Sequence, residues 1–167
     1  MNGSPTNPSP ALSDTLRHDD DLVAVVRGHL HVEMQVNRLI EGLLPYPEEI
    51  ESRLGWPQRV ELSLALGLRA QYGPPLKKLG SIRNRFAHRP DVTLEDKDVR
   101  ELYQCLHKED KDIVLESYKR TQNKVKDPLE FEFKKLDVKD QFTLLVVAIH
   151  AILQVAVSKV TGEPIAT

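Results

Sequence analysis

The segment from about Val138 to Val160 is apolar on nearly every side of a helical wheel, and this constrains the fold more than any other feature. A helix without a polar face is buried all round, either at the centre of its own domain or against a partner chain. Its longest apolar stretch, residues 144–157, is interrupted by His150 and Gln154 and is shorter than the ~20 residues that span a bilayer. We therefore expect a central helix and no membrane association.

The composition is that of a soluble globular protein. A chain of 167 residues can form one domain with its own core. Cys105 is the only cysteine, which excludes an internal disulfide and a cysteine zinc site, and the N-terminus lacks the pattern of a signal peptide. We expect a cytoplasmic protein. The formal charge of -2 argues against non-specific coating of nucleic acid, although a local basic patch can still act.

Helical periodicity and Gly/Pro breaks predict an all-α bundle of about five helices. We expect a disordered leader at 1–18, one helical domain at 19–161 and a flexible tail at 162–167. The predicted helices begin near Asp19, Pro47, Pro57, Pro75, Thr93 and Val138. Residues 60–68 also alternate, as a strand does. After Pro57 we nevertheless predict a helix. Thr93 and Asp96 resemble a capping box.

Residues 108–136 form a polar excursion that is charged throughout, so the pattern does not define its structure. Within it, Leu129–Phe133 alternates briefly, as an extended segment does.

A basic island, residues 69–89, stands out in this slightly acidic chain. No carboxylate occurs between Glu61 and Asp91, whereas six cations do: Arg69, Lys77, Lys78, Arg83, Arg85 and Arg89. A local positive potential favours a polyanion as partner. Alternatively, the island is a solvated helix face whose cations pair with carboxylates from elsewhere in the fold.

A polar stripe, His29, Glu33 and Asn37, lies four residues apart in the middle of the apolar side of the first helix. Such groups are costly to bury without partners. They either form an internal network, such as a bridge from Glu33 to an arginine that only fixes helix packing, or face a polar cavity. Arg83, Asn84 and His88 are the other polar groups expected to approach the core.

The spacing of Arg83, Asn84 and His88 suits phosphoryl transfer without a metal or another cofactor. Asn84 and His88 are four residues apart and share a helix face, with Arg83 beside Asn84. The hypothesis is attack of an RNA 2′-hydroxyl on its own phosphodiester. His88 acts as general acid or base, Arg83 stabilises the phosphorane, and Asn84 orients His88 or the substrate. Alternatively, His88 is a helix C-cap that interacts with the dipole.

Arg83-Asn84-x-x-x-His88 resembles the signature of HEPN domains, which are small dimeric helical bundles. The layout is similar too: a long first helix with a buried acidic position, the motif near the end of a later helix, and an apolar last helix. Residues 66–68 and 82–88 resemble more particularly the branch that includes mannitol operon repressor-like proteins. The similarity covers about residues 20–160, of which only 62–88 are specific.

The resemblance implies two alternative functions. Many HEPN proteins are metal-independent ribonucleases, used as toxins or in phage defence, whose motifs meet across a homodimer interface. This implies that Arg83, Asn84 and His88 are catalytic and that RNA is the substrate, with an antitoxin or regulatory protein as a further partner. The repressor-like branch is instead regarded as regulatory, and no helix-turn-helix pattern occurs here. Some members of the family are modified on a tyrosine two residues past the histidine. This chain has Pro90 there, so we do not expect that modification.

Two further assignments complete the predicted site. His29, Glu33 and Asn37 are expected to support it, and four cations are expected to bind nucleic acid: Lys77, Lys78, Arg85 and Arg89. A metal site at His29 and His31 is disfavoured, because residues two apart on a helix point about 200° away from each other.

Overall fold

The computed structural model describes residues 20–51, 53–89, 91–122 and 133–165. Every regular element in these ranges is helical, which confirms the predicted all-α class. The predicted leader at 1–18 and residues 129–132 of the Leu129–Phe133 segment lie outside the described residues. Phe133 itself belongs to a 3-10 turn, Phe133–Lys135.

The helices closely follow the predicted pattern. In chain order they are α2 (Asp21–Leu43), α3 (Glu48–Glu51), α4 (Trp56–Ala65), α5 (Gly73–His88), α6 (Asp96–Cys105), α7 (Lys108–Gln122) and α8 (Val138–Thr161), with a 3-10 turn at Ala70–Tyr72. The alternating residues after Pro57 are helical, and Pro57 lies in the first turn, where a missing backbone N–H costs nothing.

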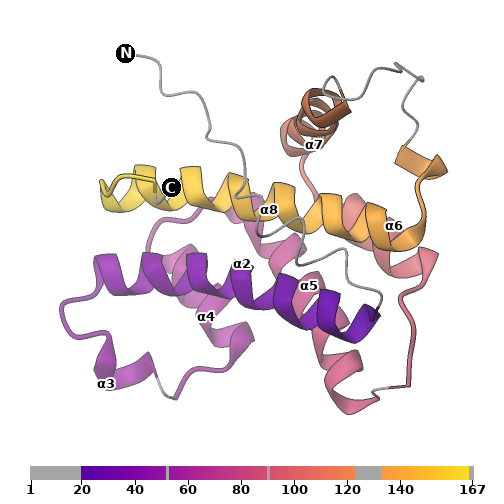
Figure 1. The fold of residues 1–167 in the computed structure, drawn as a ribbon. Coiled ribbons are helices and arrows are strands. Elements are labelled where there is room, and N and C mark those ends of the chain that lie inside the picture. Colours follow the sequence, from indigo (N-terminus) through magenta and orange to yellow (C-terminus); the bar gives the residue numbers. More distant parts are fainter. Residues whose placement is uncertain (1–19, 52, 90, 123–132, 166–167) are drawn as a thin grey trace.

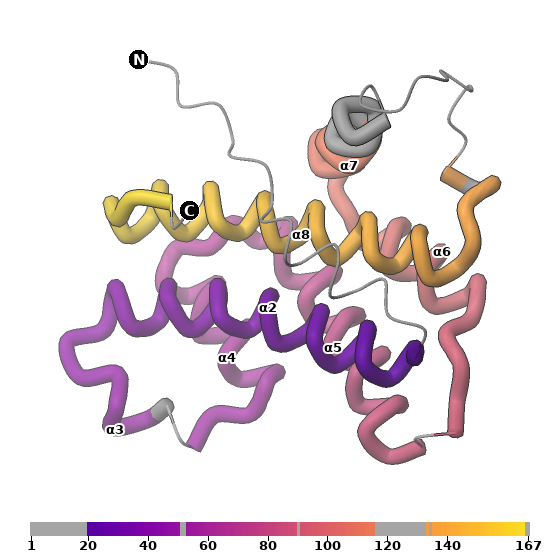
Figure 2. Tube along the Cα trace, viewed as in Figure 1, coloured from indigo at the N-terminus to yellow at the C-terminus, as the bar shows by residue number. Residues whose placement is uncertain are grey.

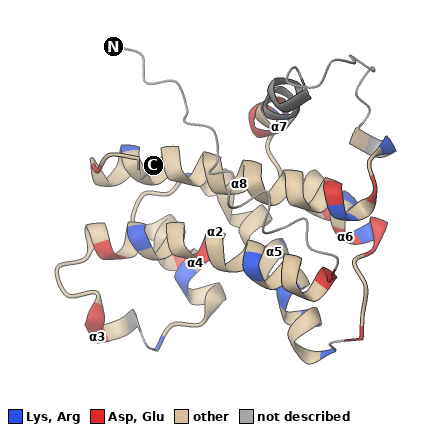
Figure 3. Ribbon diagram, viewed as in Figure 1, with Lys and Arg blue, Asp and Glu red and all other residues tan. Residues whose placement is uncertain are grey.

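The two longest helices, α2 and α8, lie side by side and run in the same direction (Figures 1 and 2). Lys139 lies 3.8 Å from Asp21 where both helices begin, and Arg38 lies 3.8 Å from Glu163 where both end. Figure 3 shows charged residues near the ends of α8 and none along its middle. This matches the burial expected for an apolar helix at the centre of the fold.

α8 is long and apolar enough to cross a membrane by length and composition, and it is the one such helix among the described residues. However, 56% of the apolar window is buried inside the protein. Its contacts with α2, α6 and α7 account for that burial. More than half of this apolar window thus packs against other helices of the fold.

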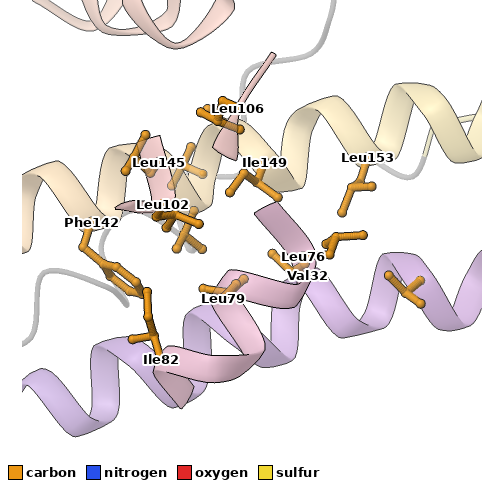
Figure 4. Close-up of a cluster of buried hydrophobic side chains, with 14 of the residues drawn as sticks. Val32, Leu76, Leu79, Ile82, Leu102, Leu106, Phe142, Leu145, Ile149 and Leu153 are labelled. Atoms are coloured by element: carbon orange, nitrogen blue, oxygen red, sulfur yellow. The ribbon is translucent and has the colours of Figure 1, made fainter. Parts of the chain in front are cut away.

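α5 joins the parts of the core, since it contacts α2, α4 and α6. Its inner side chains Leu76, Leu79 and Ile82 pack against residues of α6 and α8 that include Leu102 and Leu145 (Figure 4). The helix passes behind α2, and its C-terminal turn emerges below it in Figures 1 and 2. The last turn of α5 is anchored in the core by the fully buried Phe86, while its outer side is exposed.

One local prediction, the capping box of α6, was wrong, and the segment that the pattern left undefined contains a helix. The capping box of α6 consists of Glu95 and Asp98 and not of Thr93 and Asp96, because the backbone N–H of Leu94 is held by Asp21 and the chain stays extended to Glu95. The predicted polar excursion begins with a helix, α7. Its charge hid the periodicity, although Val114 is fully buried in the core.

Candidate functional site

The motif residues occupy the last two turns of α5. This helix has two prolines in its first turns, Pro74 and Pro75, and ends where the N–H of Arg89 reaches the carbonyl of Arg85. Arg85 and His88 lie in the last turn, where cations interact favourably with the helix dipole. His88 is therefore placed at a helix C-terminus, as its alternative interpretation predicts, and its side chain remains exposed.

Arg83, Asn84 and His88 are all accessible to solvent. Arg83 is half-buried, while Asn84 and His88 are exposed. Arg83 Nη1 donates a hydrogen bond of 3.2 Å to Asn84 Oδ1. Arg83 and His88 are five positions apart in the sequence, so the two lie about 140° apart around the helix axis, with Asn84 between them. One protomer therefore presents these side chains on a broad outer surface and does not close them around a phosphate.

Within the ranges that the structure describes, three of the six cations of the basic island have carboxylate partners from neighbouring helices. Lys77 Nζ lies 3.3 Å from Glu61 of α4. From α6, Glu101 pairs with Lys78 and the buried Asp98 pairs with Arg85. Arg89 is exposed just past the helix end. The island is thus partly neutralised in space, and contacts of Lys77, Lys78, Arg85 and Arg89 with nucleic acid stay a prediction.

Arg83 differs from its neighbours in the island. Among the described residues, no carboxylate forms an ion pair with it. Its charge acts instead on His29 of α2. Burial, and secondly the charge of Arg83, lower the pKa of His29 from 6.5 to about 4. His29 is consequently neutral at physiological pH, and the positive charge of Arg83 remains uncompensated there.

The polar stripe of α2 faces α4 and forms an internal network. Glu33 lies between His29, at 3.5 Å from Nδ1, and Arg59, at 3.9 Å from Nε. Arg59 also donates to the side-chain oxygen of Asn37. His29 is only 2% exposed. The alternative of a bridge between Glu33 and an arginine is therefore observed, but the arginine is Arg59.

Trp56 completes this cluster. Its indole ring meets the ring of His29 edge-on at a centroid distance of 4.4 Å, and its Nε1–H donates to the carbonyl of Leu76 at 3.0 Å. Gly80 of α5 makes room for the indole, because a Cβ there would lie 2.2 Å from Trp56 Cδ1. Sequence reasoning missed Trp56 and Arg59. Their spacing of three residues, just after the Gly55 break, was the available signal.

Several residues that the sequence-based hypotheses placed in one network or one site lie apart in the structure. Glu33 makes no ion pair with Arg83 or His88 among the described residues, so a structural network of these three does not form. His29 faces Trp56, whereas His31 faces His150 of α8 with a centroid distance of 6.0 Å. In the described part of the chain, no group of three or more His, Cys, Asp or Glu residues is arranged to hold a metal.

A second polar cluster lies between α2 and α8. The side-chain amide of the buried Gln35 is 3.1 Å from Nε2 of His150. Burial, and secondly the charge of His31, lower the pKa of His150 from 6.5 to about 4. The sequence pattern of α2 places Gln35 on the polar side of the helix. In the structure, α8 covers that side.

Comparisons with models of protein families, with curated proteins and with solved structures gave no match to this chain. The function of this chain is therefore inferred from the geometry of its own residues.

Proposed function

We propose that this protein is a HEPN-type, metal-independent endoribonuclease whose active site is completed by a second copy of the chain. One observation carries the proposal. Of the basic island's cations on α5, those outside the motif are neutralised by carboxylates, whereas Arg83 is not and lies beside the accessible Asn84, with His88 accessible on another side of the same helix. An uncompensated guanidinium from one protomer and an accessible imidazole from its partner are together suited to a phosphodiester.

The chemistry needs only groups of the chain and the RNA. The 2′-oxygen of a ribose forms a bond to the adjacent phosphorus, and the bond from phosphorus to the 5′-oxygen breaks. His88 accepts the proton of the 2′-hydroxyl or protonates the leaving 5′-oxygen, according to which side of the phosphate it faces. Arg83 stabilises the charge that builds on the phosphorane oxygens, and Asn84 fixes the guanidinium.

The need for a second copy follows from the position of the groups on α5. Arg83 and His88 lie about 140° apart around one helix, too far round to meet at one phosphate. Two copies related by a two-fold axis bring Arg83 of one protomer to His88 of its partner. An activity of this kind fits a toxin or phage-defence protein, and an antitoxin or regulatory protein would then restrain it.

The first experiment incubates the purified protein with RNA in the presence of EDTA and compares wild type with His88→Ala. The matched control is His107→Ala, which removes an exposed imidazole that lies outside α5. We expect cleavage by wild type and His107→Ala and none by His88→Ala, with unchanged melting temperatures. Equal degradation by wild type and His88→Ala would remove His88 from the mechanism.

The second candidate is a non-catalytic regulatory module like the mannitol operon repressor-like proteins. The ion pairs of Lys77, Lys78 and Arg85 favour it, since a neutralised helix face binds a polyanion weakly. For this candidate, RNA stays intact with every variant, while light scattering still reports on a homodimer.

A further inference from the structure

A groove of about 200 Å³ runs between α5 and the first turns of α6. α5 contributes Lys78, Ser81 and Arg85, together with the edge of Ile82. The opposite wall, from α6 and its N-cap, contains Glu101. Neither the polar stripe of α2 nor the motif residues line it, so the groove is separate from both.

The groove is polar but carries no excess charge. Three cations and three carboxylates line it. A phosphate would meet the carboxylates at close range, so the groove does not suit the RNA backbone. It does offer donors and acceptors side by side. The Lys78 ammonium has three N–H groups and gives one to Glu101, which leaves two for a ligand.

Hydrogen bonds must supply any affinity of this groove for a nucleobase. None of the described residues that line it is aromatic. Stacking on an aromatic side chain, which tolerates every base, is therefore not offered here. Hydrogen bonds to a base edge distinguish the bases, because each edge has its own order of donors and acceptors.

We propose that the groove binds a guanine base of the RNA next to the phosphate that Arg83, Asn84 and His88 engage. The proposal depends on the proposed nuclease function for the identity of the ligand. Guanine carries two adjacent donors, N1–H and the 2-amino group, which suit a carboxylate, and two adjacent acceptors, O6 and N7, which suit Lys or Arg. Glu101 and Lys78 provide that combination side by side, joined by their own ion pair where the two walls meet.

Two further observations support this assignment. The hydrogen bond from Lys78 is the main cause of the lowered pKa of Glu101, so this carboxylate is ionised and can accept hydrogen bonds at neutral pH. Ser81, Arg85 and His88 follow one another on α5 at spacings of four and three residues and therefore share one side of the helix. The groove thus ends about one helical turn, ~5 Å, from His88.

The test has a binding arm and a cleavage arm. The binding arm titrates the 3′-monophosphates of guanosine, adenosine, cytidine and uridine into the His88→Ala protein. The cleavage arm maps the cuts made by wild type in an RNA that contains every dinucleotide step. We expect a Kd for the guanosine nucleotide about tenfold below the others and cuts beside guanine.

Glu101→Gln should abolish the guanine preference in both arms. Its matched control, Glu109→Gln, changes an exposed carboxylate of α7 outside the groove and should keep the preference. Lys78→Met gives a second test from the opposite wall, and melting curves check that each variant is folded. Equal affinities for the four nucleotides, or an unchanged preference in folded Glu101→Gln, would overturn the guanine site.

The two proposals fail in different ways. Cleavage of RNA without base preference would overturn the guanine site and leave the nuclease function standing. Selective binding of the guanosine nucleotide by a protein that cuts no RNA would overturn the nuclease function and leave a guanine site. Selective binding together with cuts that ignore guanine would show that the groove takes free guanine nucleotides, which overturns its assignment to RNA.

Discussion

Arg59 Nε lies 3.9 Å from Glu33 Oε1, and this contact joins α4 to the buried stripe of α2. The same guanidinium donates to Asn37, so one side chain satisfies two polar groups of α2. The carboxylate of Glu33 is consequently engaged by Arg59 of α4, while the neutral ring of His29 lies 3.5 Å away. Arg83 on α5 is left free of carboxylates among the described residues, and this is the condition that the proposed phosphate site requires.

The first prediction separates the structural arginine from the functional one. Arg59 is 14% exposed and Glu33 is 25% exposed, so Arg59→Ala leaves a partly buried carboxylate without its cation. We expect the free energy of unfolding to fall by about 2 kcal/mol. Arg83→Ala should lower it by less than about 1 kcal/mol, since no ion pair is lost.

Denaturant titration of the three proteins measures both changes. If Arg83→Ala were the more destabilising substitution, Arg83 would be a structural residue, and the non-catalytic alternative would gain support.

The second prediction concerns the close approach of Gly80 to Trp56. A Cβ at position 80 would overlap the indole ring at 2.2–2.3 Å, and an indole cannot move aside without leaving His29. We expect Gly80→Ala to destabilise the protein by about 1–3 kcal/mol. Because Trp56 is the only tryptophan, its fluorescence should shift to longer wavelength as the ring moves toward water.

Gly55→Ala is the matched control for Gly80→Ala. Its Cβ would meet only the mobile end of Gln58, at 2.9 Å, so a smaller loss of stability and unchanged emission are expected. Equal effects of the two substitutions would contradict the packing described here.

The third prediction is a pH dependence of stability. Burial lowers the pKa of both His29 and His150 to about 4, whereas an unfolded histidine titrates at 6.5. Between these values the unfolded chain binds protons that the folded chain does not. Stability is therefore complete above pH 6.5 and falls as the pH drops toward 4, by about 1.4 kcal/mol per pH unit for each histidine.

Comparison with His29→Phe isolates one histidine from the other titrating groups. The difference between the two proteins in the slope of unfolding free energy against pH should be about 1.4 kcal/mol per pH unit in this window. Parallel slopes would show that His29 is not held neutral.

The sequence predicts a helix well where helix-breaking Gly and Pro residues and the apolar periodicity indicate the same boundaries. The predicted helix from Pro75 to His88 is α5, Gly73–His88, because Gly73, Pro74 and Pro75 form its first turn and Pro90 follows it. The apolar helix from Val138 to Val160 is α8. α7 was not predicted, because its sequence is charged throughout; among its described side chains, Val114 is the hydrophobic one that is fully buried in the core.

The candidate site was predictable only in part. The motif of α5 can be read along one helix, and so can the stripe of α2. The partner of Glu33 cannot, because Arg59 comes from a third helix whose sequence also fits a strand. In the same way, Asp98 and Glu101 of α6 form ion pairs with Arg85 and Lys78 of the basic island. The spacing of residues within the island does not predict these pairs.

The most direct test of the central claim mixes two inactive variants, Arg83→Ala and His88→Ala, after denaturation and refolding together. A composite site uses Arg83 of one protomer and His88 of its partner, so each mixed dimer regains one intact site. Half of the dimers are mixed and each has one of two sites, which predicts about a quarter of wild-type RNA cleavage. A mixture as inactive as either variant alone, beside an active wild type, would contradict a site shared between two copies.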